Sequence, residues 1–323
     1  MEIRKIQKTG GSTYLISLPK HWIKRLGLRE GNHLAIIERK DGSLILDPKY
    51  EEGEHIKETT IYAGEDVDIM ITSKYLAGYD VIKIKSSTRI SPKMREVIKS
   101  TKDRLIGVEI VEENSQEIIL NCLISPTIIP VTKTLKRIFL LSNKMYEEAI
   151  NALFEGDIEL AKNVIDRDEE VDRLYFLFVR LIRSAIQDPK LAEKIGVSPL
   201  ECLDYRIVAK NLELIADLSV LIAEKAILLK EYQVSSDVIE IIRKLAEHVK
   251  EIMYNGMQAL LSGDIKKSKQ VIEMRKHVEE LLNKSNSILL KQSINLAVHL
   301  DTIIDCLDKI GEYGSDIAEY VVA

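Results

Sequence analysis

The stretch NLELIADLSVLIAE, residues 211–224, has a counterpart in CLDKIGEYGSDIAE, residues 306–319. In both stretches Leu or Ile recurs at helical spacing with small residues on the same face, which is typical of a helix packed closely on a neighbour. At about 100° per residue, the acids that repeat with them fall on one side of that apolar face. These acids are Glu213, Asp217 and Glu224 in the first stretch and Asp308, Glu312 and Glu319 in the second. The duplicated acidic helix predicts an internal repeat.

The repeat extends upstream through a Gly-Asp pair in each copy. Gly156-Asp157 and Gly263-Asp264 are 107 residues apart, whereas Glu213 and Asp308 are 95 apart, so the first copy holds twelve extra residues near 187–201. A glycine can end one helix and an aspartate can cap the next. Each copy therefore predicts helix, turn, helix, loop and helix. The expected helices are roughly 131–154, 158–186, 199–230, 236–261, 265–291 and 293–321, which form tandem three-helix bundles over 131–232 and 233–323.

The composition predicts a cytoplasmic protein of several domains. The chain has 323 residues, a net charge of −5, 30% charged and 46% hydrophobic residues, and no apolar run long enough to insert into a membrane. Its first residues, MEIRKIQK, lack the apolar core of a signal peptide. Cys122, Cys202 and Cys306 fit neither a disulfide framework nor a zinc spacing.

The charge is unevenly distributed. Residues 1–25 carry six Lys or Arg against one Glu, a net +5, so the remaining residues carry −10. A basic segment on an acidic chain predicts contact with a polyanion.

Residues 1–49 predict a small β-rich module. We expect strands at Ile3–Gln7, Ser12–Leu18, His33–Lys40 and Ser43–Asp47, a helix at Lys20–Leu26, and a hairpin turn at Asp41-Gly42. The residues Gly10-Gly11, Ile16-Ser17-Leu18-Pro19-Lys20, Leu26-Gly27-Leu28 and Glu30-Gly31 resemble the swapped-hairpin DNA-binding family of AbrB, MazE and SpoVT.

This resemblance implies an interleaved homodimer that binds double-stranded DNA. The residues that match the DNA-facing positions of the family are Arg4, Lys5, Lys8, Lys20 and Lys24. Ile23 stands where some relatives carry arginine. The alternative is a solvated basic face on a module that only dimerises.

Residues 50–124 predict a small α+β domain with the order βαβαββ. They contain no phosphate-binding glycine loop and no nucleophile motif. A spacer or dimerisation role and a ligand-sensing role both remain open. Pro126 and Pro130 mark the linker to the bundles.

Acidic residues interrupt the apolar seam of the second long helix. Asp168 falls on that seam and Asp172 beside it, and the next long helix offers Glu213 and Asp217 at the same spacing. A carboxylate that points inward is costly unless it is paired or bound to a metal. Two helices that each offer carboxylates at i and i+4 can surround a cation that prefers oxygen ligands, such as Fe, Mn or Mg. The alternative is a set of acids paired with Lys and Arg on neighbouring helices.

These acids also resemble the D/E-x-x-x-D motif of PhoU, a phosphate-uptake regulator built of two three-helix bundles. The match consists of Asp168-Glu-Glu-Val-Asp172 and Glu213-Leu-Ile-Ala-Asp217. In the second copy Arg275 replaces the first acid, while Glu279, Asp308 and Glu312 remain as weaker metal candidates. With its basic N-terminal module, the chain resembles the archaeal regulators of the PhoU family.

Two functions follow from these resemblances. The first is a DNA-binding transcription regulator of phosphate uptake and homeostasis with a metal-binding helical sensor. The alternative is an adaptor that does not bind DNA and docks on the ATPase of a phosphate transporter. An enzyme is not expected, because no nucleophile, base or substrate cleft can be named.

Overall fold

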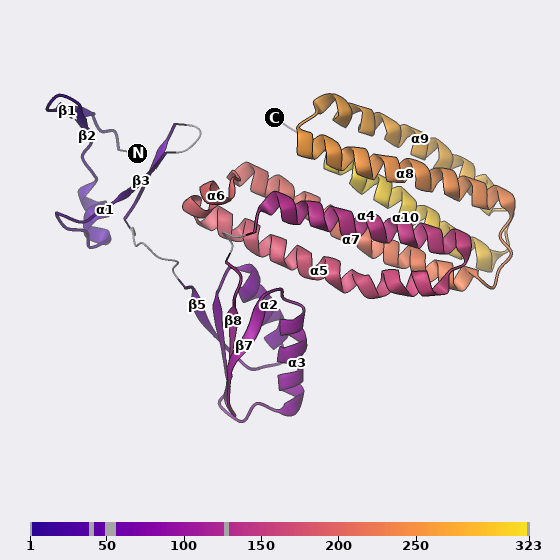
Figure 1. Ribbon diagram of the computed structural model, residues 1–323, viewed down its shortest axis with the longest axis horizontal. Coiled ribbons are helices and arrows are strands. Elements are labelled where there is room, and N and C mark those ends of the chain that lie inside the picture. Colours follow the sequence, from indigo (N-terminus) through magenta and orange to yellow (C-terminus); the bar gives the residue numbers. More distant parts are fainter. Residues whose placement is uncertain (1, 39–41, 49–55, 126–128, 322–323) are drawn as a thin grey trace. The chain divides into compact units, whose positions relative to one another are not determined.

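The computed structural model describes residues 2–38, 42–48, 56–125 and 129–321. By its internal contacts the chain divides into two units, residues 1–55 and 56–323. The expected fold class is confirmed: an N-terminal hairpin module, a small α+β domain and a pair of tandem three-helix bundles (Figure 1).

In its described residues the N-terminal unit contains two hairpins and one short helix. Strand β1 (Gln7–Thr9) pairs antiparallel with β2 (Thr13–Leu15), α1 spans Lys20–Arg25, and β3 (Ala35–Glu38) pairs with β4 (Leu44–Asp47).

The strand predicted over Ile3–Gln7 is wrong. The turn at Gly10, with φ +62°, sets a register in which Gln7 is the first residue to pair, opposite Leu15. Asp41 of the predicted turn and the end of the predicted third strand lie outside the described residues, as does Pro126.

The middle domain has the predicted order βαβαββ. Its elements are β5 (Glu58–Tyr62), α2 (Val67–Leu76), β6 (Val81–Lys85), α3 (Pro92–Asp103), β7 (Val108–Glu113) and β8 (Glu117–Cys122). The strand order is β5-β6-β8-β7, with β5 parallel to β6 and the other pairs antiparallel. Alternating residues of the strands, such as Ile82 and Ile84, are buried. Helices α2 and α3 cover one face of this sheet (Figure 1).

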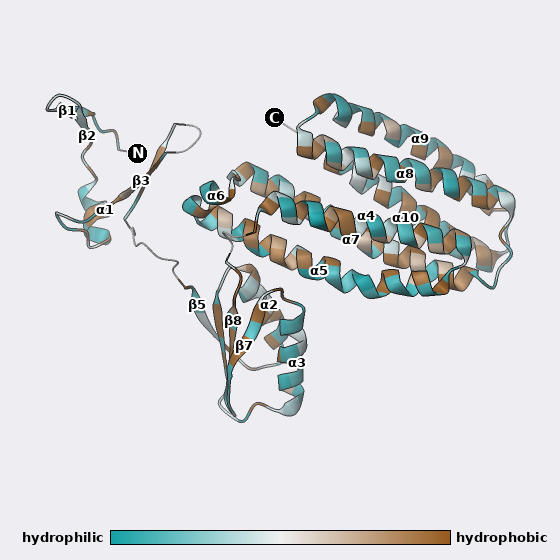
Figure 2. Cartoon of the chain, viewed as in Figure 1, coloured by the Kyte–Doolittle hydropathy of each residue, from teal (hydrophilic) through white to brown (hydrophobic). Residues whose placement is uncertain are grey.

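The remaining helices form two bundles. The first contains α4 (Val131–Glu155), α5 (Ile158–Gln187) and α7 (Pro199–Leu229), and the second contains α8 (Ser236–Ser262), α9 (Ile265–Leu289) and α10 (Ile294–Glu319). Helix α7 packs on α10, so the bundles share one hydrophobic core. Figure 2 shows hydrophilic and hydrophobic residues alternating along these helices, as expected of helices that bury one face.

Side-chain caps set the turns of the repeat. Gly156 and Gly263 end α4 and α8 with φ +67° and +66°. Asp157 then accepts a hydrogen bond from the Leu160 amide at 3.0 Å, and Asp264 caps α9 in the same way. These Gly-Asp turns agree with the prediction from the sequence.

The loop predicted near residues 187–201 is wrong in part. It contains a further helix, α6 (Pro189–Ile195), which Asp188 caps and Gly196 ends with φ +75°. This helix accounts for most of the extra residues of the first repeat. The capping box that opens α7 is present, since Ser198 and Glu201 bond reciprocally to each other's backbone amides.

Direct contacts attach the middle domain to the first bundle. The Phe176 side chain of α5 packs against both the sheet core and the bundle core. One turn further along α5, Arg180 is buried against the end of α2. None of the helices that the structure describes is long and apolar enough to cross a membrane.

Candidate functional site

Helices α5 and α7 bring the four predicted acids of the first bundle to one place. Asp168 and Asp172 are one turn apart on α5, and Glu213 and Asp217 are one turn apart on α7. The two helices are fixed by buried neighbours of these acids, including Val171 on α5. We call Asp168, Asp172, Glu213 and Asp217 the first acid cluster.

The four carboxylates disfavour one another's charge. Partial burial, followed by the charges of Asp172 and Glu213, raises the pKa of Asp168 above its ordinary value. Partial burial also raises the pKa of Asp217, and the nearby charge of Asp168 raises it further. The pKa values of Asp172 and Glu213 are likewise raised, with burial as the main cause. This arrangement favours a bound cation or a proton.

Among the described residues, two side-chain cations partly compensate the first acid cluster. Lys210 forms an ion pair with Glu213, and Arg104 of the middle domain lies 3.8 Å from Asp172. Lys210 also lies over the ring of Tyr175, 5.6 Å from its centroid. Two cations beside four acids leave the cluster with an excess of negative charge, so the alternative of full pairing with Lys and Arg accounts for only part of it.

The donor chemistry of the first acid cluster fits an ion that prefers oxygen ligands. Among the described residues, however, no three His, Cys, Asp or Glu side chains stand close enough together to hold a metal ion. Binding would therefore require the carboxylates to turn toward a shared centre. The metal ion and the roles of these four residues stay predictions.

In the second bundle an arginine occupies the corresponding place. Arg275 of α9 pairs with Asp308 of α10, and one of its Nη atoms is buried without a hydrogen-bond partner in the described residues. Glu279 and Glu312 are exposed beside it, at the edge of an open pocket of about 340 Å³. The guanidinium supplies locally the positive charge that a cation would bring.

One acid of this region was not singled out from the sequence. Asp316 lines the same pocket, and burial together with the charges of Glu319 and Glu312 raises its pKa, while Arg275 lowers it. Its position one helical turn after Glu312 could have revealed it.

The five predicted DNA-contacting residues are all exposed. Lys8 lies on β1, Lys20 and Lys24 lie one turn apart on α1, and Arg4 and Lys5 precede β1. Arg4 pairs with Glu2, whereas no ion pair is found for the four lysines within the described residues. These lysines are thus available to an anionic partner.

The N-terminal unit also exposes apolar side chains. None of its described residues is buried, and Ile3, Ile6, Tyr14 and Ile36 are each more than 60% exposed. So much exposed apolar surface on so small a unit predicts that it is covered by a partner.

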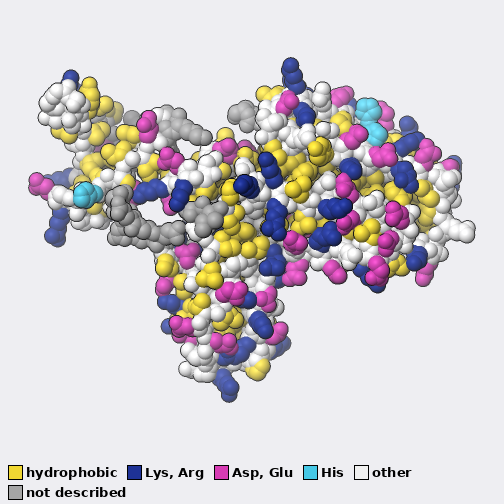
Figure 3. Space-filling model, viewed as in Figure 1, with side chains coloured by type: hydrophobic (Ala, Val, Ile, Leu, Met, Phe, Trp, Pro, Cys, Tyr) yellow, Lys and Arg dark blue, Asp and Glu magenta, His cyan; other side chains and the backbone are white. Residues whose placement is uncertain are grey.

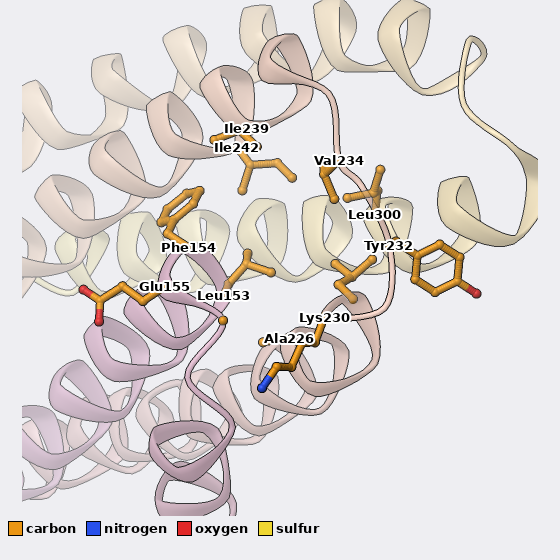
Figure 4. Close-up of a pocket in the computed structure, with 12 residues that line it drawn as sticks. Leu153, Phe154, Glu155, Ala226, Lys230, Tyr232, Val234, Ile239, Ile242 and Leu300 are labelled. Carbon is orange, nitrogen blue, oxygen red and sulfur yellow. The ribbon is translucent and has the colours of Figure 1, made fainter.

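A second pocket lies where α4, α7, α8 and α10 meet. It has a volume of about 430 Å³ and is lined mainly by apolar side chains, including Phe154, Ile242 and Leu300. Figure 4 shows these side chains around the cavity, with the charged ends of Glu155 and Lys230 directed outward from it. The guanidinium of Arg243 lies 4.1 Å from the centroid of the Phe154 ring.

Fold and sites together define a class: a helical protein of two repeated three-helix bundles, preceded by a hairpin module. The family model of the PhoU domain matches residues 135–226 and 242–321, and this chain belongs to the PhoU family. The model "Antidote-toxin recognition MazE, bacterial antitoxin" matches residues 7–53. Both family resemblances expected from the sequence are confirmed, while the archaeal source stays a prediction.

Individual relatives agree with this assignment. The chain is 27% identical over 178 residues to the phosphate-specific transport system accessory protein PhoU homolog of Zymomonas mobilis. This alignment covers 53% of this chain and 73% of the relative. The crystal structure of PhoU from Pseudomonas aeruginosa matches with a TM-score of 0.55 and 20% identity over 60% of this chain and 95% of that one. PhoU from Streptococcus pneumoniae matches with a TM-score of 0.52 and 17% identity over 59% and 91%. These structures share the fold of the bundles.

Proposed function

We propose that this protein is a DNA-binding transcription regulator of phosphate uptake and homeostasis. The observation that carries the proposal is the presence, in one chain, of a MazE-type module at residues 7–53 and PhoU bundles from residue 135 onward. The net charge of +5 on residues 1–25 gives the module the sign that a DNA partner requires.

The N-terminal module acts as a homodimer in this proposal. Two copies cover each other's exposed Ile3, Ile6 and Ile36, and each presents one set of the exposed lysines. Most of these lysines meet phosphates, which positions the protein without reading the sequence. Arg4 is the one arginine among the five, and a guanidinium can hydrogen-bond a guanine edge through two N–H groups.

The helical body acts as the sensor. The first acid cluster binds a divalent or ferric ion, with Fe, Mn or Mg as the candidates, through Asp168, Asp172, Glu213 and Asp217. Arg275 makes the second bundle independent of such an ion. The protein is a cytoplasmic regulator and carries out no catalytic turnover.

The Zymomonas relative is named as a transport system accessory protein, which supports a second candidate function. In that alternative the bundles dock on the ATPase of a phosphate transporter and the N-terminal module only dimerises. The basic residues then form a solvated face.

A mobility-shift assay with the DNA upstream of the protein's own gene separates the two candidates. The intact chain should shift this DNA, and residues 50–323 should not, while their helices keep the same thermal unfolding. If the truncated chain shifts the DNA as well, the module is not the DNA-binding part. If neither form shifts it, and residues 50–323 retain a transporter ATPase in pull-down, the adaptor is correct.

A further inference from the structure

Two histidines stand next to each other on the second bundle, outside both groups of acids. The ring centroids of His248 on α8 and His277 on α9 are 6.4 Å apart, and the ring planes differ by 23°. His277 is exposed and His248 is partly exposed. Figure 3 shows histidine side chains forming one group on the surface of the helical part.

The backbone under both histidines is fixed by the core. Val249 follows His248 and Val278 follows His277, and both valines are fully buried. Helices α8 and α9 are joined by the short Gly263-Asp264 turn and pack along each other. The separation of the two histidines is therefore set by the bundle, and only the ring rotamers remain adjustable.

A hydrogen bond sets the proton position on His248. Its Nδ1 lies 2.8 Å from the carbonyl oxygen of Lys244, and because a carbonyl only accepts, Nδ1–H is the donor. The lone pair is then left on Nε2, at the outer end of the ring. Histidines that ligate metals are commonly held in this way, with the second ring nitrogen donating to a backbone carbonyl.

The lysines beside the pair have carboxylate partners of their own. Lys244 pairs with Glu240, and Lys276 pairs with Glu273. Their charges are thus largely compensated, which lowers the repulsion that an incoming cation would meet. Within the described residues no third His, Cys, Asp or Glu completes the group, so water would fill the remaining positions.

We propose that His248 and His277 together bind a divalent transition-metal ion of the class that prefers imidazole, Cu²⁺ or Zn²⁺. Metal–nitrogen bonds of about 2.0–2.1 Å require the two rings to turn their nitrogen atoms toward a shared centre. The rotation is open to His277 because its ring is exposed. The bound ion links α8 to α9 and is chemically distinct from the oxygen-preferring ion proposed for the first acid cluster.

Copper binding to the full chain tests the site directly. One equivalent of Cu²⁺ should give an electron paramagnetic resonance spectrum with couplings from two imidazole nitrogens. His248→Ala and His277→Ala should each raise the dissociation constant at least tenfold and reduce the coupling to one nitrogen at most. His33→Ala, which removes an exposed histidine from the N-terminal unit, is the matched control. It should leave the dissociation constant for Cu²⁺ and the nitrogen couplings unchanged.

The acid cluster must be excluded as the source of the signal. Asp168→Asn should leave the nitrogen couplings and the affinity for Cu²⁺ unchanged. The proposal is overturned if the double variant of His248 and His277 binds the first equivalent of Cu²⁺ as tightly as the intact chain. It is also overturned if the spectrum of the intact chain shows no coupling to imidazole nitrogen. Circular dichroism of each variant verifies that the helices are intact.

Discussion

Arg180 of α5 forms an ion pair with Asp80 of the middle domain, with 2.8 Å between Nη2 and Oδ1. The arginine is 1% exposed and also donates hydrogen bonds to the carbonyls of Tyr75 and Tyr79. Asp80 in turn accepts a hydrogen bond from the Lys57 amide at 2.9 Å. One buried guanidinium therefore satisfies three acceptors at the end of α2 and holds the sheet domain on the bundle.

Replacing Arg180 should loosen this attachment. Arg180→Ala takes the ion-pair partner from the partly exposed Asp80 and one donor from each of the Tyr75 and Tyr79 carbonyls, a loss of about 1–3 kcal/mol. Urea unfolding of the full chain should then show the middle domain unfolding before the bundles. Arg183→Ala, one turn away and exposed, is the control and should stay within about 0.5 kcal/mol of the parent. If Arg180→Ala and Arg183→Ala lower the free energy of unfolding equally, Arg180 has no specific role in this attachment.

A close approach of α8 and α10 predicts that Gly256 cannot carry a side chain. A Cβ at this position would lie 2.4 Å from the carbonyl oxygen of Gly314, so the backbone of α10 would have to shift. Gly256→Ala should destabilise the chain by about 1–3 kcal/mol, as overpacking in a core does. Thermal unfolding measures the effect, with Gly64→Ala as the control, because a Cβ at Gly64 has no neighbour within 4 Å. An unchanged melting temperature in Gly256→Ala would be inconsistent with this packing.

The first acid cluster should make stability depend on pH. The folded chain raises the pKa of Asp168, so the folded state binds protons more tightly than the unfolded state above the ordinary pKa of aspartate, about 3.9. Its contribution to stability consequently falls as the pH rises through the raised pKa. In chelator-treated protein, Asp168→Asn should therefore raise the melting temperature at pH 7, and the gain should shrink toward pH 4.

A control variant and the addition of a metal ion test this explanation further. Asp166→Asn changes an exposed acid two residues away and should have little effect at either pH. When Mn²⁺ is added, the intact chain should gain stability and Asp168→Asn should not. If Mn²⁺ stabilises both forms equally, the cluster does not bind it.

Arg275 should decide whether the second bundle binds a metal ion. Arg275→Asp restores the acid that the first copy has at Asp168 and removes the partner of Asp308. In the presence of chelator the variant should melt at a lower temperature than the intact chain. Mn²⁺ should restore its melting temperature, and elemental analysis should find one more bound ion than in the intact chain. Lys276→Ala, which changes the exposed neighbour, should do neither. If Arg275→Asp binds no additional metal ion, the residue at position 275 does not by itself determine whether the second bundle binds metal.

The fold could be predicted from the sequence wherever local chemistry decides it. The Gly156-Asp157 and Gly263-Asp264 turns and the Ser198 capping box are short-range signals, and the helices end within about two residues of the predicted ends. Helix α6 was missed although Asp188, Pro189 and Gly196 provide a start and an end for it. It was overlooked because seven residues are too few to show an apolar period.

Contacts between distant segments could not be predicted in this way. The pairing of Arg180 with Asp80 joins residues 100 positions apart, and no pattern around Arg180 distinguishes it from the exposed Arg183. The nearness of Arg104 to Asp172 is equally non-local. The four acids of the cluster could be singled out because their spacing on each helix is local and matches the D/E-x-x-x-D motif of the PhoU family.

DNA binding of the intact chain as a function of salt tests the central claim most directly. Fluorescence anisotropy with the protein's own upstream DNA, compared with scrambled DNA, should give a log affinity that falls linearly with log salt concentration. Lys24→Ala should weaken binding to both DNAs and reduce the slope by up to about 1.8, since each phosphate contact contributes about 0.9 and a dimer loses the lysine twice. Lys194→Ala, on the exposed face of α6, should change neither quantity. An intact chain that shows no salt-dependent affinity for DNA, or a slope that Lys24→Ala leaves unchanged, would contradict the proposal that this protein is a DNA-binding regulator.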